Sequence, residues 1–121
     1  MEKYVRVPIF PVTKYLTKGE RLKIPAPMLP LSFEYCGDEI IVDRVVECDR
    51  GISLKVGGRG YWFECRVSWC VDDKWRTKNS KIWFDDFLQE WFVEVPESKA
   101  PADWHEATQL SDIQNFVDEF S

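Results

Sequence analysis

The stretch from Tyr61 to Val71 reads YWFECRVSWCV, and it decides the fold class of the chain. Its side chains alternate between two faces of an extended strand. One face would carry Tyr61, Phe63, Cys65, Val67, Trp69 and Val71, and the other Trp62, Glu64, Arg66, Ser68 and Cys70. A period of two is typical of a half-buried antiparallel strand. The sequence therefore predicts a β domain built around this segment.

A hairpin is predicted upstream of this strand. Leu31, Phe33 and Tyr35 alternate in the same way, and residues 36–38 supply turn chemistry before a second apolar run over residues 39–48. The second run is irregular, because several of its apolar residues are contiguous. Either both faces of this strand are covered or a β-bulge resets its register near Asp43.

Further short strands are expected on both sides of these elements, at 3–10, 21–24, 52–56, 81–84 and 91–95. Residues 57–60 are a glycine-rich turn, and residues 72–78 are expected to form a polar loop. Closely spaced strands joined by Gly and Pro turns indicate a small antiparallel barrel or a curled sheet. The fold class is therefore mainly β.

The character of the chain changes after Pro96. We divide it into a β-rich domain over 1–96, a linker or arm over 97–109, and a C-terminal amphipathic α-helix over 110–121. Ser111 and Gln114 have the spacing of a capping box. The apolar face of this helix, expected to dock on the domain or on a partner, consists of Ile113, Phe116, Val117 and Phe120.

Composition restricts the class of partner. The net charge is −5, with +2 on residues 1–60 and −7 on residues 61–121, so general binding to nucleic acid is disfavoured and no membrane partner is expected. The N-terminus has no apolar core of a signal peptide, and no run of about 18 apolar residues could span a bilayer. Four cysteines in that setting predict free thiols and a cytoplasmic location.

No residue pattern reaches the strength of a catalytic, cofactor or metal signature. Cys65 and Cys70 would point to opposite faces of their strand, and the single histidine, His105, lies in the expected arm. The carboxylate pairs at 72–73 and 85–86 are typical of turns and strand ends. We therefore expect no catalytic residue, no cofactor and no metal, and we do not assign the chain to an enzyme class.

One basic and aromatic set is the best candidate for a binding surface. Small β-barrels bind single-stranded nucleic acid by combining a cationic groove with stacking rings. The candidate residues are Arg59, Trp62, Trp75, Arg76, Lys78 and Lys81.

The chain resembles a group of small bacterial β-rich proteins. The resemblance covers about residues 29–95 and rests on the "Ile/Val-Asp-Arg-Val" pattern at 42–45, the Gly-Gly-x-Gly run at 57–60 and Trp-Phe-Val-Glu at 91–94. The chain departs from the group at both ends and in a longer insert around 72–80. The resemblance implies a compact β domain and no particular activity.

The leading functional hypothesis is a small interaction module that binds protein, either another chain or a second copy of itself. Its basis is the aromatic content of 15%, since exposed aromatic patches usually mark contact surfaces. The alternatives are a single-stranded nucleic-acid binder and an enzyme whose carboxylate site the sequence does not reveal.

Overall fold

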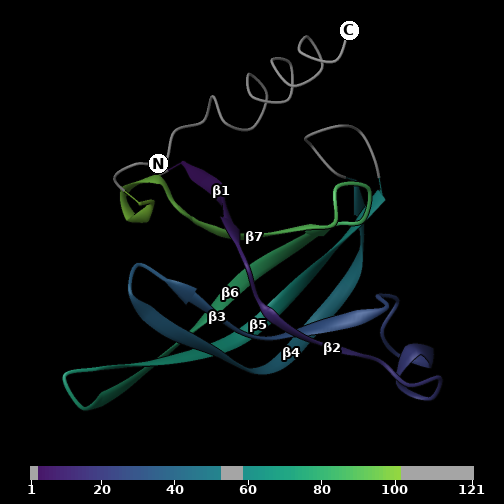
Figure 1. Ribbon diagram of the computed structural model, residues 1–121, viewed down its shortest axis with the longest axis horizontal. Helices are drawn as coiled ribbons and strands as arrows, with labels where there is room; N and C mark the ends of the chain where they lie inside the picture. The colour runs from purple at the N-terminus through teal and green to yellow at the C-terminus, as the bar shows by residue number, and fades with distance from the viewer. Residues whose placement is uncertain (1–2, 53–58, 102–121) are drawn as a thin grey trace, which may run out of the picture.

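The computed structural model describes residues 3–52 and 59–101 of the chain, and these residues form one antiparallel β-sheet (Figure 1). Its seven strands are β1 (Tyr4–Ile9), β2 (Val12–Tyr15), β3 (Met28–Tyr35), β4 (Asp38–Ile52), β5 (Arg59–Val71), β6 (Lys74–Asp85) and β7 (Glu90–Pro96). Their order across the sheet is β1-β7-β6-β5-β4-β3-β2. The predicted all-β curled sheet is confirmed.

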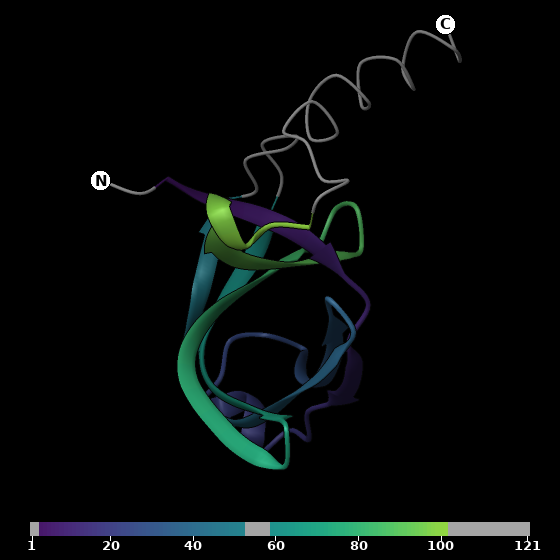
Figure 2. The same cartoon turned by 90° about the vertical axis from the view of Figure 1, so that its left-hand side faces the viewer.

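The two edges of the sheet are consecutive in the chain. β1 forms one edge and pairs with β7, and β2 forms the other edge and pairs with β3. Only Phe10 and Pro11 separate β1 from β2 in the chain. The sheet must therefore curl until its edges meet, and β1 comes into contact with β3. Figure 2 shows the strands curling round the core in this way. The fold is a half-barrel whose first segment contributes to both edges.

β5 has the alternation that the sequence predicts. Phe63, Cys65 and Val67 are buried inside the curl, whereas Trp62 and Glu64 lie on the outer face and keep part of their surface exposed. The main core combines these residues with Val5, Val7, Ile9, Phe33, Ile40, Ile82, Phe84, Trp91, Val93 and Val95. β5 is central because both of its neighbours pair along most of its length.

The predicted hairpin is confirmed as β3 and β4. Its two-residue loop, Cys36–Gly37, has positive φ at both positions (49° and 85°), which matches the right-handed twist of the strands that it joins. The irregular apolar run of β4 results from two register shifts, between Val42 and Arg44 and between Val45 and Glu47. The bulge alternative near Asp43 was therefore the correct one.

The polar loop expected at 72–78 is wrong. β5 runs to Val71 and β6 starts at Lys74, so the turn is only Asp72–Asp73, with φ of 50° and 64°. Asp tolerates left-handed backbone better than most residues, because its short side chain bonds locally to the main chain. Residues 74–80 are therefore strand, and this moves their side chains to alternate faces.

The strand expected at 21–24 is also wrong, whereas the one expected at 3–10 is confirmed as β1. Residues 20–22 form a 3-10 turn, η1 (Glu20–Leu22). Thr17 and Glu20 exchange side-chain-to-backbone hydrogen bonds of 3.1 and 3.3 Å, and this reciprocal capping favours a helical turn over an extended segment.

The C-terminal α-helix that we included in the fold class is not supported, so that part of the prediction is wrong. Within residues 3–52 and 59–101 the structure has no α-helix, only the 3-10 turns η1 and η2 (Glu97–Lys99). Residues 110–121, with Ile113, Phe116, Val117 and Phe120, lie outside the described ranges. An apolar period of about ten residues gives a helix little stability of its own, because nucleation is costly. The fold rests on the sheet.

The chain beyond β7 is described as far as Pro101. The Glu97 N–H donates to the Lys3 carbonyl at 2.8 Å, and the Tyr35 hydroxyl donates to the carbonyl of Lys99. The start of the predicted arm therefore lies against the sheet. In the part of the chain that the structure describes, no helix is long and apolar enough to cross a membrane.

Candidate functional site

The outer face of the sheet carries a cluster of indole rings and cations. The register places Trp62 of β5 directly opposite Trp83 of β6, and Lys81 of β6 two pairs further along, on the same face. The Lys81 ammonium lies 4.8 and 4.7 Å from the two ring centroids, and the Arg6 guanidinium of β1 lies 3.6 Å from that of Trp83. Such cation–π contacts are attractive, by about 0.5–1 kcal/mol each at exposed sites.

A glycine permits this arrangement. Gly51 of β4 has no positive φ, but a Cβ atom there would lie 3.1 Å from Trp83 and 3.2 Å from Trp62. Both indoles therefore pack against bare backbone at this point. We refer to Arg6, Gly51, Trp62, Lys81 and Trp83 as the tryptophan patch.

The charges around the patch are ordered by strand register. Glu94 of β7 stands between Arg6 and Lys81, so opposite charges alternate across three strands. Burial lowers the pKa of Arg6 from its usual value, and the carboxylates of Glu94 and Asp85 oppose that shift. Among the described residues, Trp83 also has a buried indole N–H, Nε1, without a hydrogen-bond acceptor. Such a group costs about 1–3 kcal/mol.

The structure divides the predicted binding residues between two faces. Trp62 and Lys81 belong to the tryptophan patch, and Trp75 lies on the same outer face near the Asp72–Asp73 turn, 63% exposed. Arg76 and Lys78 alternate with Trp75, so they lie on the inner face, where Lys78 sits 5.5 Å from the Trp69 ring. Arg59 begins β5, and its side chain lies outside the described residues. One continuous cationic groove is therefore not formed by this set.

Trp83, Arg6 and Gly51 were missed by the sequence reasoning. Trp83 lay in the expected strand at 81–84, and it shares a face with Lys81, which was a usable signal. Its position opposite Trp62, however, depends on the two-residue Asp72–Asp73 turn, which the sequence reasoning replaced with a loop. Arg6 joins only because β1 pairs with β7 at the far end of the chain.

The described residues give little support to the alternative of an enzyme with a carboxylate site. The Asp85 side chain is buried and accepts hydrogen bonds from the N–H groups of Phe87 and Leu88 at 3.0 and 2.9 Å, as a turn cap does. A pocket of 340 Å³ lies between the end of β1 and the start of β7, and its lining includes Phe10, Gln89 and Trp91. Glu90 is the one ionisable side chain in that lining, so the pocket does not gather several carboxylates.

The four cysteines are free and differ in how exposed they are. Cys36 and Cys70 are exposed and Cys65 is buried, so Cys65 and Cys70 do lie on opposite faces. Burial raises the pKa of Cys65 to about 12 and that of Cys48 to about 11. Among the described residues, no group of three His, Cys, Asp or Glu side chains is placed to hold a metal ion.

Thiol reactivity should follow this division. At pH 8 we expect a maleimide reagent to modify Cys36 and Cys70 rapidly, and Cys48 and Cys65 only when the protein is unfolded. The reason is that the reactive thiolate is disfavoured by its raised pKa at the buried Cys65 and at the partly buried Cys48, and both thiols are shielded from the reagent. Mass spectrometry of the native and urea-treated protein would count the labels. Equal labelling of Cys65 in both states would contradict the packing described here.

No protein-family model matches the chain, and no curated protein or solved structure was found to be similar to it.

Proposed function

We propose that the chain is a protein-binding module and that the tryptophan patch is its contact surface. The observation that carries this proposal is the incomplete burial of large rings. Of the five tryptophans that the structure describes, only Trp91 is buried, at 7% exposure. Trp, Tyr and Arg are the residues most enriched at the energetic centres of protein interfaces.

The rigidity of the patch supports the same function. Trp62 and Trp83 pack on Gly51 and are flanked by cations, so their rotamers are restricted before any partner arrives. A preorganised aromatic surface loses little side-chain entropy on binding, which leaves more of the contact energy as affinity.

Single-stranded nucleic acid is the less favoured ligand of this surface. Base stacking needs a free ring face and phosphate binding needs available cations. Here Lys81 lies over both indoles and Arg6 over Trp83, so the rings and cations already engage one another. Arg76 and Lys78 lie on the opposite face of the sheet.

The free thiols of Cys36 and Cys70 also support a reducing, cytoplasmic setting for the module.

The test compares Trp62→Ala with Tyr4→Ser, a control at an exposed aromatic residue of β1 outside the patch. A protein captured from the source cells by the wild-type chain is purified and titrated against each variant by calorimetry. We expect about thirtyfold weaker binding for Trp62→Ala, as for an interfacial hot spot, and unchanged binding for Tyr4→Ser. Self-association by sedimentation is measured in the same variants, because the partner could be a second copy.

Two results would count against the proposal. One is equal affinity of the wild type and Trp62→Ala for every partner found, with circular dichroism showing both to be folded. The other is tight binding of a short single-stranded oligonucleotide that weakens steeply with salt and depends on Trp62 and Lys81. That second result would mean that the tryptophan patch binds single-stranded nucleic acid and not protein.

A further inference from the structure

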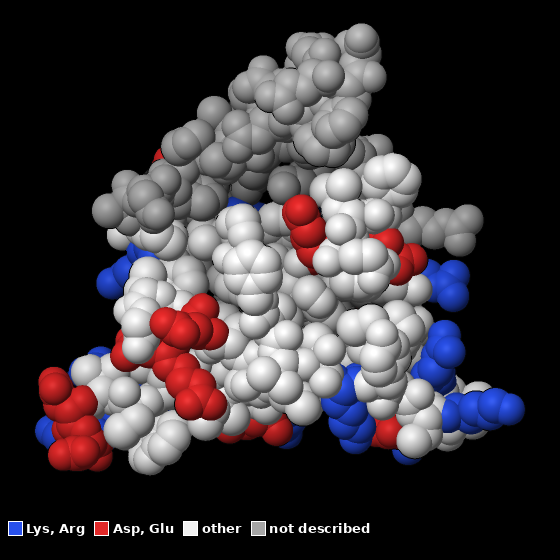
Figure 3. Space-filling view, in the orientation of Figure 1, with Lys and Arg blue, Asp and Glu red and all other residues white. Residues whose placement is uncertain are grey.

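The end of β2 and its connection to β3 form a basic end of this acidic protein. Four exposed cations, Lys14, Lys18, Arg21 and Lys23, fall within ten residues that contain a single carboxylate, Glu20, giving a local charge of +3. Figure 3 shows blue side chains gathered over η1, at the lower right of the view. The net charge of −5 therefore conceals an end of opposite sign. The expectation of no membrane partner was drawn from that total charge.

Two large apolar side chains project from the same end. Leu22 is 87% exposed and Tyr15 is 76% exposed, and each is next to a cation in the sequence, Arg21 and Lys14. The Lys14 ammonium is paired with Glu20 at 3.3 Å, which ties the end of β2 to η1. Leu22 thus stands between Arg21 and Lys23 in the exposed turn, whereas Tyr15, which follows Lys14 in β2, points to the opposite face of that strand.

This surface is held in place by the fold. The Thr17–Glu20 hydrogen bonds cap η1, and the Leu16 N–H donates to the Pro27 carbonyl at 3.0 Å across the base of the connection. Leu16 and Ala26, on either side of that base, are buried. Leu22 is consequently exposed by a fixed turn, and the exposure does not arise from a loose loop.

We propose that this basic end docks on an anionic lipid surface, with Leu22 entering the headgroup region and Lys18, Arg21 and Lys23 facing lipid phosphates and carboxylates. An exposed apolar residue flanked by Lys and Arg has the composition of an interfacial membrane contact. The lipid supplies the negative charge that this end lacks. A hydrophilic polyanion would satisfy the cations but would leave Leu22 without an apolar environment.

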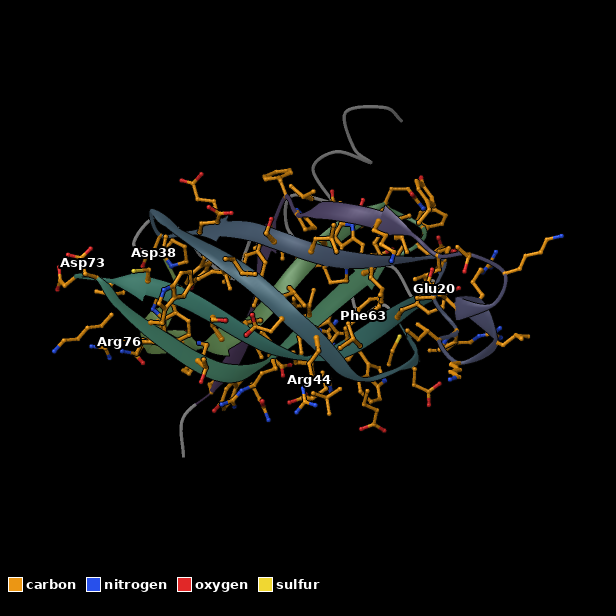
Figure 4. The ribbon with its side chains drawn as sticks, turned by 90° about the horizontal axis from the view of Figure 1, so that it is seen from below. Glu20, Asp38, Arg44, Phe63, Asp73 and Arg76 are labelled. Carbon is orange, nitrogen blue, oxygen red and sulfur yellow. The ribbon has the colours of Figure 1, made fainter. Side chains whose placement is uncertain are left out.

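The acidic remainder of the molecule does not prevent this docking. The Debye length is about 8 Å at physiological ionic strength, so charges at the opposite end of the sheet are largely screened. Figure 4 shows how far the ends are separated, with Glu20 at one end and Asp73 and Arg76 at the other. The local charge of +3 therefore determines the electrostatic attraction between this end and a lipid surface.

The test measures partition of the full chain onto phosphatidylcholine vesicles with and without phosphatidylserine, by co-sedimentation. We expect binding only with phosphatidylserine. Lys18→Gln/Arg21→Gln should weaken it about thirtyfold, since each basic residue near an anionic surface contributes about 1 kcal/mol. Lys74→Gln/Arg76→Gln, at the opposite end, removes the same charge and should leave binding unchanged. Leu22→Ser should weaken binding about tenfold.

Three outcomes would overturn the proposal. They are equal binding to both kinds of vesicle, equal losses in the two charge variants, and full binding by Leu22→Ser. A single-stranded oligonucleotide that binds in place of vesicles and is insensitive to Leu22→Ser would also overturn it, in favour of a soluble polyanion. Failure here is separate from failure of the tryptophan patch, because none of the variants changes Trp62, Trp83, Lys81, Arg6 or Gly51.

Discussion

Phe63→Ala is expected to lower the free energy of unfolding by about 4 kcal/mol, as truncation of a fully buried phenylalanine usually does. Phe63 is 0% exposed at the middle of β5, and its ring centroid lies 5.6 Å from that of Trp91. Removing the ring leaves a cavity that two flanking strands cannot collapse into. Urea denaturation followed by far-ultraviolet circular dichroism would measure the loss.

The matched control for this substitution is Phe87→Ala. Phe87 lies in the turn between β6 and β7 and is 71% exposed, so its truncation should change stability by less than about 0.5 kcal/mol. A loss for Phe63→Ala no larger than that for Phe87→Ala would mean that β5 is not the centre of the core.

Gly60→Ala is expected to cost about 3 kcal/mol, at the upper end of what overpacking usually does. A Cβ atom on Gly60 would lie 2.6 Å from the backbone oxygen of Phe84, a contact that only movement of the β5–β6 pair could relieve. Because the obstacle is main chain, no side-chain rotation removes it. Thermal unfolding by calorimetry would show the effect.

Gly19→Ala provides the comparison within the same chain. The nearest atom to a Cβ there is 4.0 Å away and its φ is −64°, so alanine fits and stability should be unchanged or slightly raised. If both glycine variants unfolded at the wild-type temperature, the close approach of β5 and β6 at Gly60 would be contradicted.

The strands of this fold were largely predictable because their signals are local. Alternation identified β5, and the turn chemistry of Cys36–Gly37 identified the β3–β4 hairpin. The bulge near Asp43 was expected from contiguous apolar residues. The Asp72–Asp73 turn was missed because two aspartates, rather than Asn-Gly, adopt its left-handed backbone. Propensity alone does not distinguish such a turn from a polar loop.

The helical part of the prediction failed for the converse reason. Apolar residues at helical spacing over 110–121 describe a capacity for amphipathic helix, but a short helix needs tertiary contacts to form. The sequence held no information about such contacts. In the described residues the sheet joins its own edges through β1 and β2, and no helix takes part in that closure.

The candidate site was predictable only in part. Trp62 and Lys81 were named from the sequence, but Trp75 was grouped with Arg76 and Lys78 as if all three faced the same way. Once residues 74–80 are a strand, alternation separates them. Arg6 and Gly51 enter the site through long-range pairing of β1 with β7 and of β4 with β5, which no local pattern reports.

The bend at Phe10–Pro11 also bears on how the chain is made. During synthesis β1 and β2 leave the ribosome before the other described strands, and the partner of β1, β7, is translated some 80 residues after it. β1 must therefore wait, unpaired, until almost the whole described sheet has emerged, whereas β2 can pair with β3 as soon as β3 has been translated. Pairings so distant in sequence slow folding and prolong the exposure of strand edges to other chains. A nascent chain of this protein would thus depend on chaperones most during that interval, before β7 completes the closure.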